Sequence, residues 1–347
     1  MRKYALGTIF ALVFLCVLYV GKPIIMPFVL AVFIWYMVNI LTDFYGKPLP
    51  GLKIKLPRPV AFTVALATII SAVYIAMRII LSNISEVSAA IPAYQYNLEQ
   101  MSRRLLAFIP WDEPLSFSKL MAGVDFGSVA RVAATEVTSF LGKGFIILIY
   151  LLFLFFEQGS FKNKLASLFP DPHRRSEIDG ILKRINDDIR TYIGIKTVVS
   201  LVTAILCYFV MASVGLNFAS FWAFLVFVLN FIPTVGSIIA TIIPTFFALM
   251  QFENLGPFLV VLIGVGVLEG GIGSVIEPRF QGDRLNLSPL VILFSLALWN
   301  MVWGVPGMFL CVPLTSIAMI ILSHFEQTKP IAIALSRMGK LKQEKES

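Results

Sequence analysis

Long apolar stretches with almost no charge inside them restrict the fold of this chain more than any other feature. A bilayer core about 30 Å thick is crossed by roughly 20 apolar residues of helix, and backbone groups in lipid must find hydrogen-bond partners within the protein. The composition agrees, because 58% of the 347 residues are hydrophobic and only 14% are charged. The sequence therefore predicts an all-α polytopic membrane protein. Its eight apolar runs are 5–20, 24–42, 59–81, 139–156, 197–215, 218–250, 256–276 and 287–322.

The basic residues predict how these runs are oriented. The net charge is +8, but the Lys and Arg residues gather beside apolar runs, where they mark the cytoplasmic side of a membrane rather than a nucleic-acid partner. Most of the 28 basic residues lie in the N-terminus, 43–58, 158–196, 277–288 and 324–347, whereas 82–138 has four basic and six acidic residues. We therefore expect both termini in the cytoplasm, an uncleaved first helix, and 82–138 outside.

The run 218–250 does not fit a single span. Lys196 and Arg279 both look cytoplasmic and no Lys or Arg lies between them, so the chain crosses an even number of times in this interval. A straight helix of this length would measure about 50 Å, too long for one span, and the run is too short for two spans of about 20 residues. We predict a helical hairpin that enters from the outside and turns near Pro233–Gly236, where proline lacks an amide donor and glycine tolerates a turn.

The run 287–322 is interrupted in the same way, at Asn300–Gly307, and predicts a second hairpin that enters from the inside. For each run the alternative is a pair of short, tilted spans. In either case the interrupted backbone must face protein or a watery cavity. Two interrupted helical elements that enter the membrane from opposite sides indicate a transporter site near the membrane midplane.

The predicted organisation is about six full transmembrane helices plus two broken helical hairpins, with one external and one cytoplasmic amphipathic helical segment. Its parts are N-terminal transmembrane helices 1–81, external segment 82–138, transmembrane helix 139–157, cytoplasmic segment 158–196, transport core 197–323 and cytoplasmic tail 324–347.

Three stretches of sequence resemble a known family: "NFIPTVG" at 230–236, "EPRFQGDRLNLSPLVILFSLALW" at 277–299 and "GVPGMFLCVPLT" at 304–315. Together with the layout of the helices, they are similar to the autoinducer-2 exporter family. The resemblance implies a multi-pass transporter of the bacterial inner membrane, with export of autoinducer-2 proposed for some members and sodium/proton antiport for others. Two departures, Gly273–Ser274 in place of Gly–Asn and Glu269 in place of a neutral amide, leave the substrate and the coupling ion open.

The two interruptions contain the candidate solute-binding residues. Their amide groups either contact a polyhydroxylated solute or cap broken helix ends, and their Gly and Pro residues shape the turns. These residues are Asn230, Pro233, Thr234, Gly236, Asn300, Gly304, Pro306 and Gly307.

Glu269 is the candidate ion-coupling residue. It lies about eight residues from the cytoplasmic end of its run, roughly 10–12 Å into the bilayer, where a carboxylate is costly and usually faces a cavity or a partner. The alternative is a neutral, hydrogen-bonded structural carboxylic acid. The adjacent Gly270, Gly271 and Gly273 permit close helix contact or local unwinding, and of these we expect packing.

A polar cluster follows at the cytoplasmic end of the same run. It is either a surface ion-pair network or a cytoplasmic gate between the hairpins. The gate candidates are Glu277, Pro278, Arg279, Gly282 and Arg284.

Two amphipathic stretches predict further contacts. The first has heptad spacing that Pro92 interrupts, which favours a homo-oligomer over packing within the chain; its apolar residues are Ile84, Val87, Ile91, Tyr94, Leu98, Met101, Leu105 and Phe108. The second predicts a cytoplasmic helix over 174–196 on the anionic leaflet; its apolar face holds Ile178, Ile181, Leu182, Ile185, Ile189 and Ile193.

No catalytic constellation is present in the sequence. It has no Walker loop and no HExxH motif, and its three cysteines lie inside apolar runs without metal-ligand spacing. We expect no enzyme, no cofactor and no metal. The expected function is secondary transport, with membrane lipids and a small solute or ion as partners; the alternative is a non-transporting membrane scaffold.

Overall fold

The computed structural model describes residue 9 and residues 13–47, 56–106, 126–252, 254–281 and 286–339, with side chains left out at 84–96, 98–106, 126–141 and 162. Residues 13–20 are helical. The elements that follow are α2 (Lys22–Tyr45), α3 (Arg58–Leu106), α5 (Phe126–Glu157), α6 (Phe161–Leu168), α7 (Pro172–Ser213), α8 (Ala219–Leu229), α9 (Val235–Gln251), α10 (Leu255–Gly271), a π-helix (Ile272–Ile276), α11 (Glu277–Gln281), α12 (Pro289–Trp303), α13 (Val305–His324) and α14 (Lys329–Leu335).

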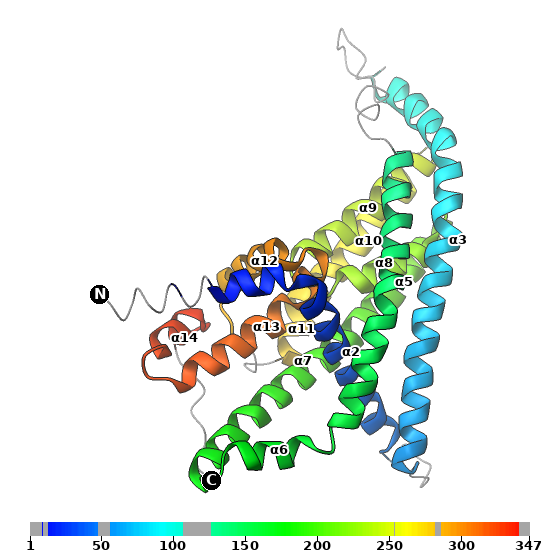
Figure 1. Cartoon of the computed structure of the whole chain (residues 1–347). Coiled ribbons are helices and arrows are strands. Elements are labelled where there is room, and N and C mark those ends of the chain that lie inside the picture. Colours follow the sequence, from blue (N-terminus) through cyan, green and yellow to red (C-terminus); the bar gives the residue numbers. More distant parts are fainter. Residues whose placement is uncertain are drawn as a thin grey trace. The chain divides into compact units, whose positions relative to one another are not determined.

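The prediction of an all-α polytopic membrane protein is confirmed (Figure 1). Within the described ranges, the extended backbone pairing is one isolated bridge, between Leu287 and Ser336. Five helical stretches there are long and apolar enough to cross a membrane: Lys22–Tyr45, Arg58–Asn83, Pro172–Ser213, Leu255–Phe280 and Val305–His324. The predicted run 139–156 forms the second half of α5.

Several segments that the sequence separates are continuous helices. α3 extends from the apolar run 59–81 through Pro92 to Leu106. α7 joins the stretch 174–196 to the apolar run 197–215 without interruption. The reason is local, since no helix breaker stronger than Gly194 lies at the junction in α7, and one glycine costs a helix only about 1 kcal/mol.

The chain divides into two compact units. Unit 1 comprises 1–66, 142–195 and 281–347, and unit 2 comprises 67–141 and 196–280. The predicted transport core 197–323 therefore contributes residues to both units.

Unit 1 contains the second interrupted run. α12 packs against α13 as a helical hairpin, and the indole Nε1 of Trp303 donates to the carbonyl oxygen of Leu18 at 3.1 Å. Ser288, just before α12, donates its backbone amide to Leu335 at the end of α14 at 3.0 Å. The start of the hairpin is thus held against the segment that follows it.

The apolar face of the 174–196 stretch is partly covered by protein. Ile189 and Ile193 are buried, with 6% and 1% of their surface exposed. This end of the predicted amphipathic helix therefore contacts protein. An ion pair between Arg190 and Asp43 also joins α7 to α2.

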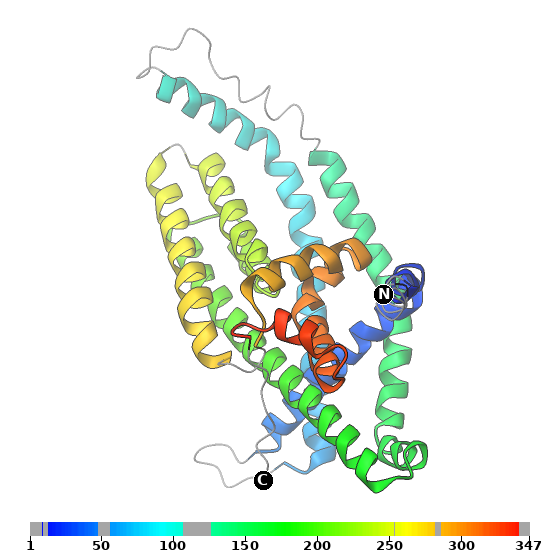
Figure 2. The same ribbon diagram turned by 90° about the vertical axis from the view of Figure 1, so that its left-hand side faces the viewer.

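Unit 2 has its core where the second part of α7 meets α8, α9 and α10. Cys207 and Met211 of α7, Trp222 and Val226 of α8, and Val261 and Val265 of α10 are all buried in one cluster. Figure 2 shows α9 and α10 (yellow-green and yellow) running side by side, as their contacts require. The indole of Trp222 is buried in this cluster and donates to the backbone carbonyl of Asn217. Trp222 is therefore a packing residue.

The first interrupted run is a hairpin whose two ends meet. Gln251, the last residue of α9, donates its side-chain amide to the carbonyl of Gly215 at 2.8 Å and accepts from the backbone amide of Asn217 at 2.7 Å. The segment before α8 and the end of α9 therefore lie together. This geometry supports an even number of crossings, because the chain returns to the place where the run began. The side chain of Asn97, on α3, donates to the carbonyl of Gln251.

Candidate functional site

The turn between α8 and α9 is tight and strained. α8 ends at Leu229, and the following residues leave the helix until α9 begins at Val235. Thr234 has φ 59° and ψ −56°, and the amide of Val235 donates to the carbonyl of Pro233 at 2.6 Å. This is a γ-turn with positive φ at a β-branched residue, a conformation that costs energy and clusters at functional sites. The turn falls at the predicted place.

Gly236 is needed for a close approach, not for a left-handed backbone. The residue with positive φ is Thr234. A Cβ on Gly236 would lie 1.8 Å from the carbonyl oxygen of Leu229 and 3.1 Å from the Cβ of Ile232. The first turn of α9 therefore rests directly on the last carbonyl groups of α8.

The turn between α12 and α13 uses the same device with a different backbone. Gly304 adopts φ 71° and ψ −144°, a region that residues with a Cβ essentially avoid. A Cβ on Gly307 would lie 2.0 Å from the carbonyl oxygen of Trp299. Asn300 is exposed, and its carbonyl accepts from the amide of Gly304 at 2.7 Å. In both hairpins a glycine in the first turn of the second helix lets it pack on the end of the first.

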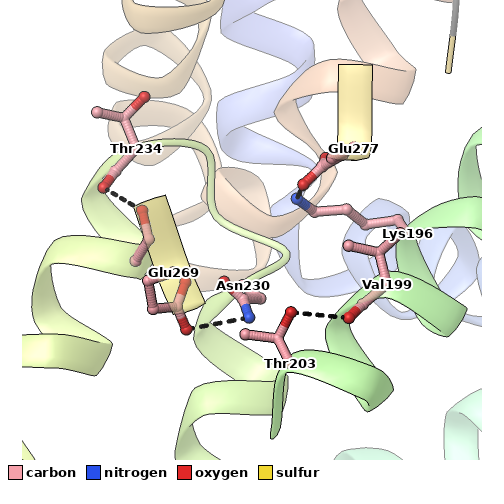
Figure 3. Close-up of polar contacts among 8 residues, drawn as sticks. Lys196, Val199, Thr203, Asn230, Thr234, Glu269 and Glu277 are labelled. Atoms are coloured by element: carbon pink, nitrogen blue, oxygen red, sulfur yellow. Dashed lines mark hydrogen bonds and ion pairs between the residues drawn. The ribbon is translucent and has the colours of Figure 1, made fainter. Parts of the chain in front are cut away.

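The structure brings Asn230 and Glu269 together (Figure 3). The side-chain amide of Asn230, in the first turn, donates to Oε1 of Glu269 on α10 at 3.2 Å. Glu269 is buried, with 5% of its surface exposed. The predicted coupling residue and a predicted solute-binding residue therefore form one polar site in unit 2. Asn300, Gly304, Pro306 and Gly307 belong to unit 1, so a meeting of the two turns stays a prediction.

A partly buried ion pair joins α7 to α11 (Figure 3). The Nζ atom of Lys196, on α7, donates to both carboxylate oxygens of Glu277 at 2.6 and 2.8 Å. The two side chains are 8% and 17% exposed. In the sequence Lys196 is a marker of topology, and its role in this ion pair was not predicted. A signal for this role is present in the sequence. Ser200 lies one helical turn after Lys196 and Thr203 lies two turns after it, so the three polar residues share one face of an otherwise apolar helix.

These residues belong to a buried polar stripe on α7. Lys196, Ser200, Thr203 and Cys207 recur at helical spacing and are all buried. The hydroxyl of Thr203 donates to the carbonyl of Val199 at 2.9 Å. A polar stripe at this depth is expensive in a bilayer unless it faces other polar groups.

The structure describes two of the remaining gate candidates. Pro278 and Arg279 are exposed. Gly282 and Arg284 lie outside the described residues. Among the described gate candidates, Glu277 forms a partly buried ion pair.

The glycines beside Glu269 affect the shape of their own helix rather than its contact with another helix. No described atom lies within 4 Å of a Cβ built on Gly270, Gly271 or Gly273. The preference for packing is therefore wrong. Instead the helix widens into the π-helix Ile272–Ile276, a form of local unwinding that the small residues permit and that occurs frequently at functional sites.

In the part of the chain that the structure describes, no three His, Cys, Asp or Glu side chains gather closely enough to bind a metal ion. The polar chemistry of the site is that of one amide, one ammonium group and two carboxyl groups.

The fold defines a polytopic membrane protein that contains interrupted helices. The model of the AI-2E family transporter matches residues 8–327, and the chain belongs to this family, as its motifs predicted. It is 28% identical over 336 residues to the AI-2 transport protein TqsA of Escherichia coli K12, with 94% of each chain covered. It is 27% identical over 342 residues to a putative transport protein of Haemophilus influenzae, with 96% of each covered. A putative transport protein of Borreliella burgdorferi is 32% identical over 246 residues, which are 71% of this chain and 67% of the relative.

Proposed function

We propose that this protein is a secondary transporter that exports a small polar solute such as autoinducer-2 across the bacterial inner membrane. The observation that carries the proposal is the contact between Asn230, at a break in a membrane helix, and the buried Glu269. A solute with several hydroxyl groups suits such a site, because an amide offers both donors and an acceptor. The relative named as an AI-2 transport protein supports this choice of solute.

Glu269 supplies the coupling in this proposal. A buried carboxyl group in a membrane helix exchanges a proton or a monovalent cation when its surroundings open to water. Because Asn230 lies in the turn and donates to the carboxyl group, a change in the ionisation of Glu269 changes a hydrogen bond of the solute site. Solute movement and proton movement are thereby linked.

The second candidate function is sodium/proton antiport. The observation that favours it is the group formed by the buried Lys196 and Glu269 and the partly buried Glu277, because two carboxyl groups and one ammonium group together carry one net negative charge, which attracts a cation. In that case Asn230 contacts the ion rather than an organic solute.

Flux into proteoliposomes separates the two functions. The purified protein is reconstituted, and uptake of autoinducer-2 and of sodium is measured with and without an imposed pH gradient. Autoinducer-2 flux that the gradient drives supports the export proposal. Sodium flux without autoinducer-2 flux supports antiport, and no flux of either contradicts both.

The orientation and assembly proposals accompany this function. We place both termini in the cytoplasm. We also propose that copies of the chain join through a seam, the heptad-spaced apolar residues from Ile84 to Phe108. If so, replacing Leu98 and Leu105 with Asp lowers the mass of the complex in detergent, because each carboxylate would have to leave water on assembly. An unchanged mass assigns the seam to contacts within the chain.

A further inference from the structure

The π-helix between Glu269 and Glu277 determines which way the two carboxyl groups point. Two residues eight apart in a regular α-helix differ by about 80° around the axis. A π-turn holds one residue more than an α-turn, so the difference falls to about 20°. The structure agrees, since Glu277 binds Lys196 on α7 and Glu269 lies within electrostatic range of Cys207, also on α7. Both carboxyl groups therefore face the polar stripe of α7.

One buried cation, Lys196, lies near two carboxyl groups, of which Glu269 is buried and Glu277 is partly buried. The charges of Lys196 and Glu277 both act on Glu269. Cys207 of α7 also lies near Glu269, and Asn230, which donates to it, is neutral. When Glu269 is protonated, Lys196 and Glu277 balance each other. When Glu269 is ionised, these three side chains together carry one net negative charge.

We propose that Lys196 is the counter-charge of the coupling site, shared between Glu269 and Glu277, and that the π-helix brings the second carboxyl group within its reach. Lys196 and Glu277 are then positioning residues: neither needs to contact the solute, and together they set the pH at which Glu269 exchanges its proton. This inference rests on the proposed coupling role of Glu269.

In this proposal Lys196 and Glu277 shift the pH midpoint of flux in opposite directions. Glu277→Gln frees Lys196 to balance an ionised Glu269, so the midpoint of the pH–flux profile moves toward acid. Lys196→Gln removes the compensating charge, so the midpoint moves toward alkali. Each shift is about one pH unit or more, the usual effect of a nearby charge. In the double variant Lys196→Gln/Glu277→Gln the midpoint returns toward that of the unmodified protein.

A purely structural ion pair gives a different result. Breaking it from either side would lower the amount of folded protein and the flux alike, without opposite shifts. The matched control is the exposed pair of Lys164 and Glu157, whose side chains are 60% and 49% exposed; Lys164→Gln and Glu157→Gln leave the midpoint unchanged.

The experiment measures flux in proteoliposomes from pH 5 to 9 for these variants, with the elution profile in detergent as the test of folding. Opposite shifts support the proposal; equal shifts, or none, overturn it. If a single variant does not fold, Glu277→Asp keeps a carboxylate but withdraws it from Lys196, and a smaller acid shift is expected; no shift overturns the proposal. If flux of the unmodified protein is independent of pH, the coupling role of Glu269 fails first, which is a separate result.

Discussion

The α-carbon of Gly236 lies so close to the carbonyl of Leu229 that an added Cβ would come within 1.8 Å of the oxygen. That carbonyl is at the end of α8, so its position is fixed by the helix. The start of α9 can therefore approach this carbonyl group only if residue 236 is a glycine. This contact determines how sharply the hairpin turns and thus where Asn230 lies.

Gly236→Ala is expected to abolish flux and to destabilise the protein by about 1–3 kcal/mol or more, because the overlap forces the two helices apart. The measurement is the melting temperature in detergent, together with flux. Gly144→Ala, inside α5, is the control, since no described atom lies within 4 Å of its Cβ and alanine favours a helix by about 1 kcal/mol. Equal behaviour of the two variants would show that the close approach is not required.

The second hairpin makes an analogous prediction at Gly304. Alanine there must adopt φ 71° and ψ −144°, which costs about 1–3 kcal/mol. We expect Gly304→Ala to lower the melting temperature and the flux, and Val305→Ala, at a neighbouring residue that is 64% exposed, to change neither. A stable Gly304→Ala variant with full flux would mean that the backbone can turn in another way.

Glu269→Gln tests the coupling group. Glutamine preserves the shape and is neutral at every pH, so the variant mimics protonated Glu269. Flux should therefore stay at the level that the unmodified protein shows at low pH, and should no longer vary with pH. The exposed Glu157→Gln is the control and keeps the original profile. An unaltered pH profile in Glu269→Gln would assign the carboxyl group a structural role.

Cysteine labelling tests the path of the first hairpin. Because Gln251 binds the backbone of Gly215 and Asn217, single cysteines at 217 and 253 should react with an impermeant reagent from the same, outer side of intact cells. A cysteine at 100 should react from that side as well, and one at 180 should not. Cys16 is exposed and is first replaced by Ser, whereas Cys207 and Cys311 are buried. Reaction of 217 without 253 would contradict the hairpin.

Much of the fold could be read from the sequence because lipid imposes simple rules. The hydrophobic thickness of a bilayer limits the length of a span, so the run 218–250 had to bend, and its proline and glycine residues indicated where. The motifs at 230–236 and 277–299 predicted the family. These inferences depend on composition and local chemistry, which the sequence contains in full.

The ends of the helices were less predictable. A helix continues through a boundary in the sequence unless another interaction of the backbone competes with its hydrogen bonds. A change from polar to apolar residues at Lys196 marked a boundary for the membrane, but the backbone of α7 continues through it. Pro92 marked a break in the heptad pattern, yet α3 also continues. Hydrophobicity reports the surroundings of a helix and not its length.

Only the tertiary structure decided which polar residues meet. Asn230 and Glu269 are 39 residues apart and Lys196 and Glu277 are 81 apart, so neither pair has a local signature. The π-helix adds a second reason, because a regular helix would point Glu269 and Glu277 in different directions. The sequence alone determined that charges lie at membrane depth, since each residue type and its run can be read directly; their partners depend on how α7 packs against α10, which follows from the fit of many side chains at once.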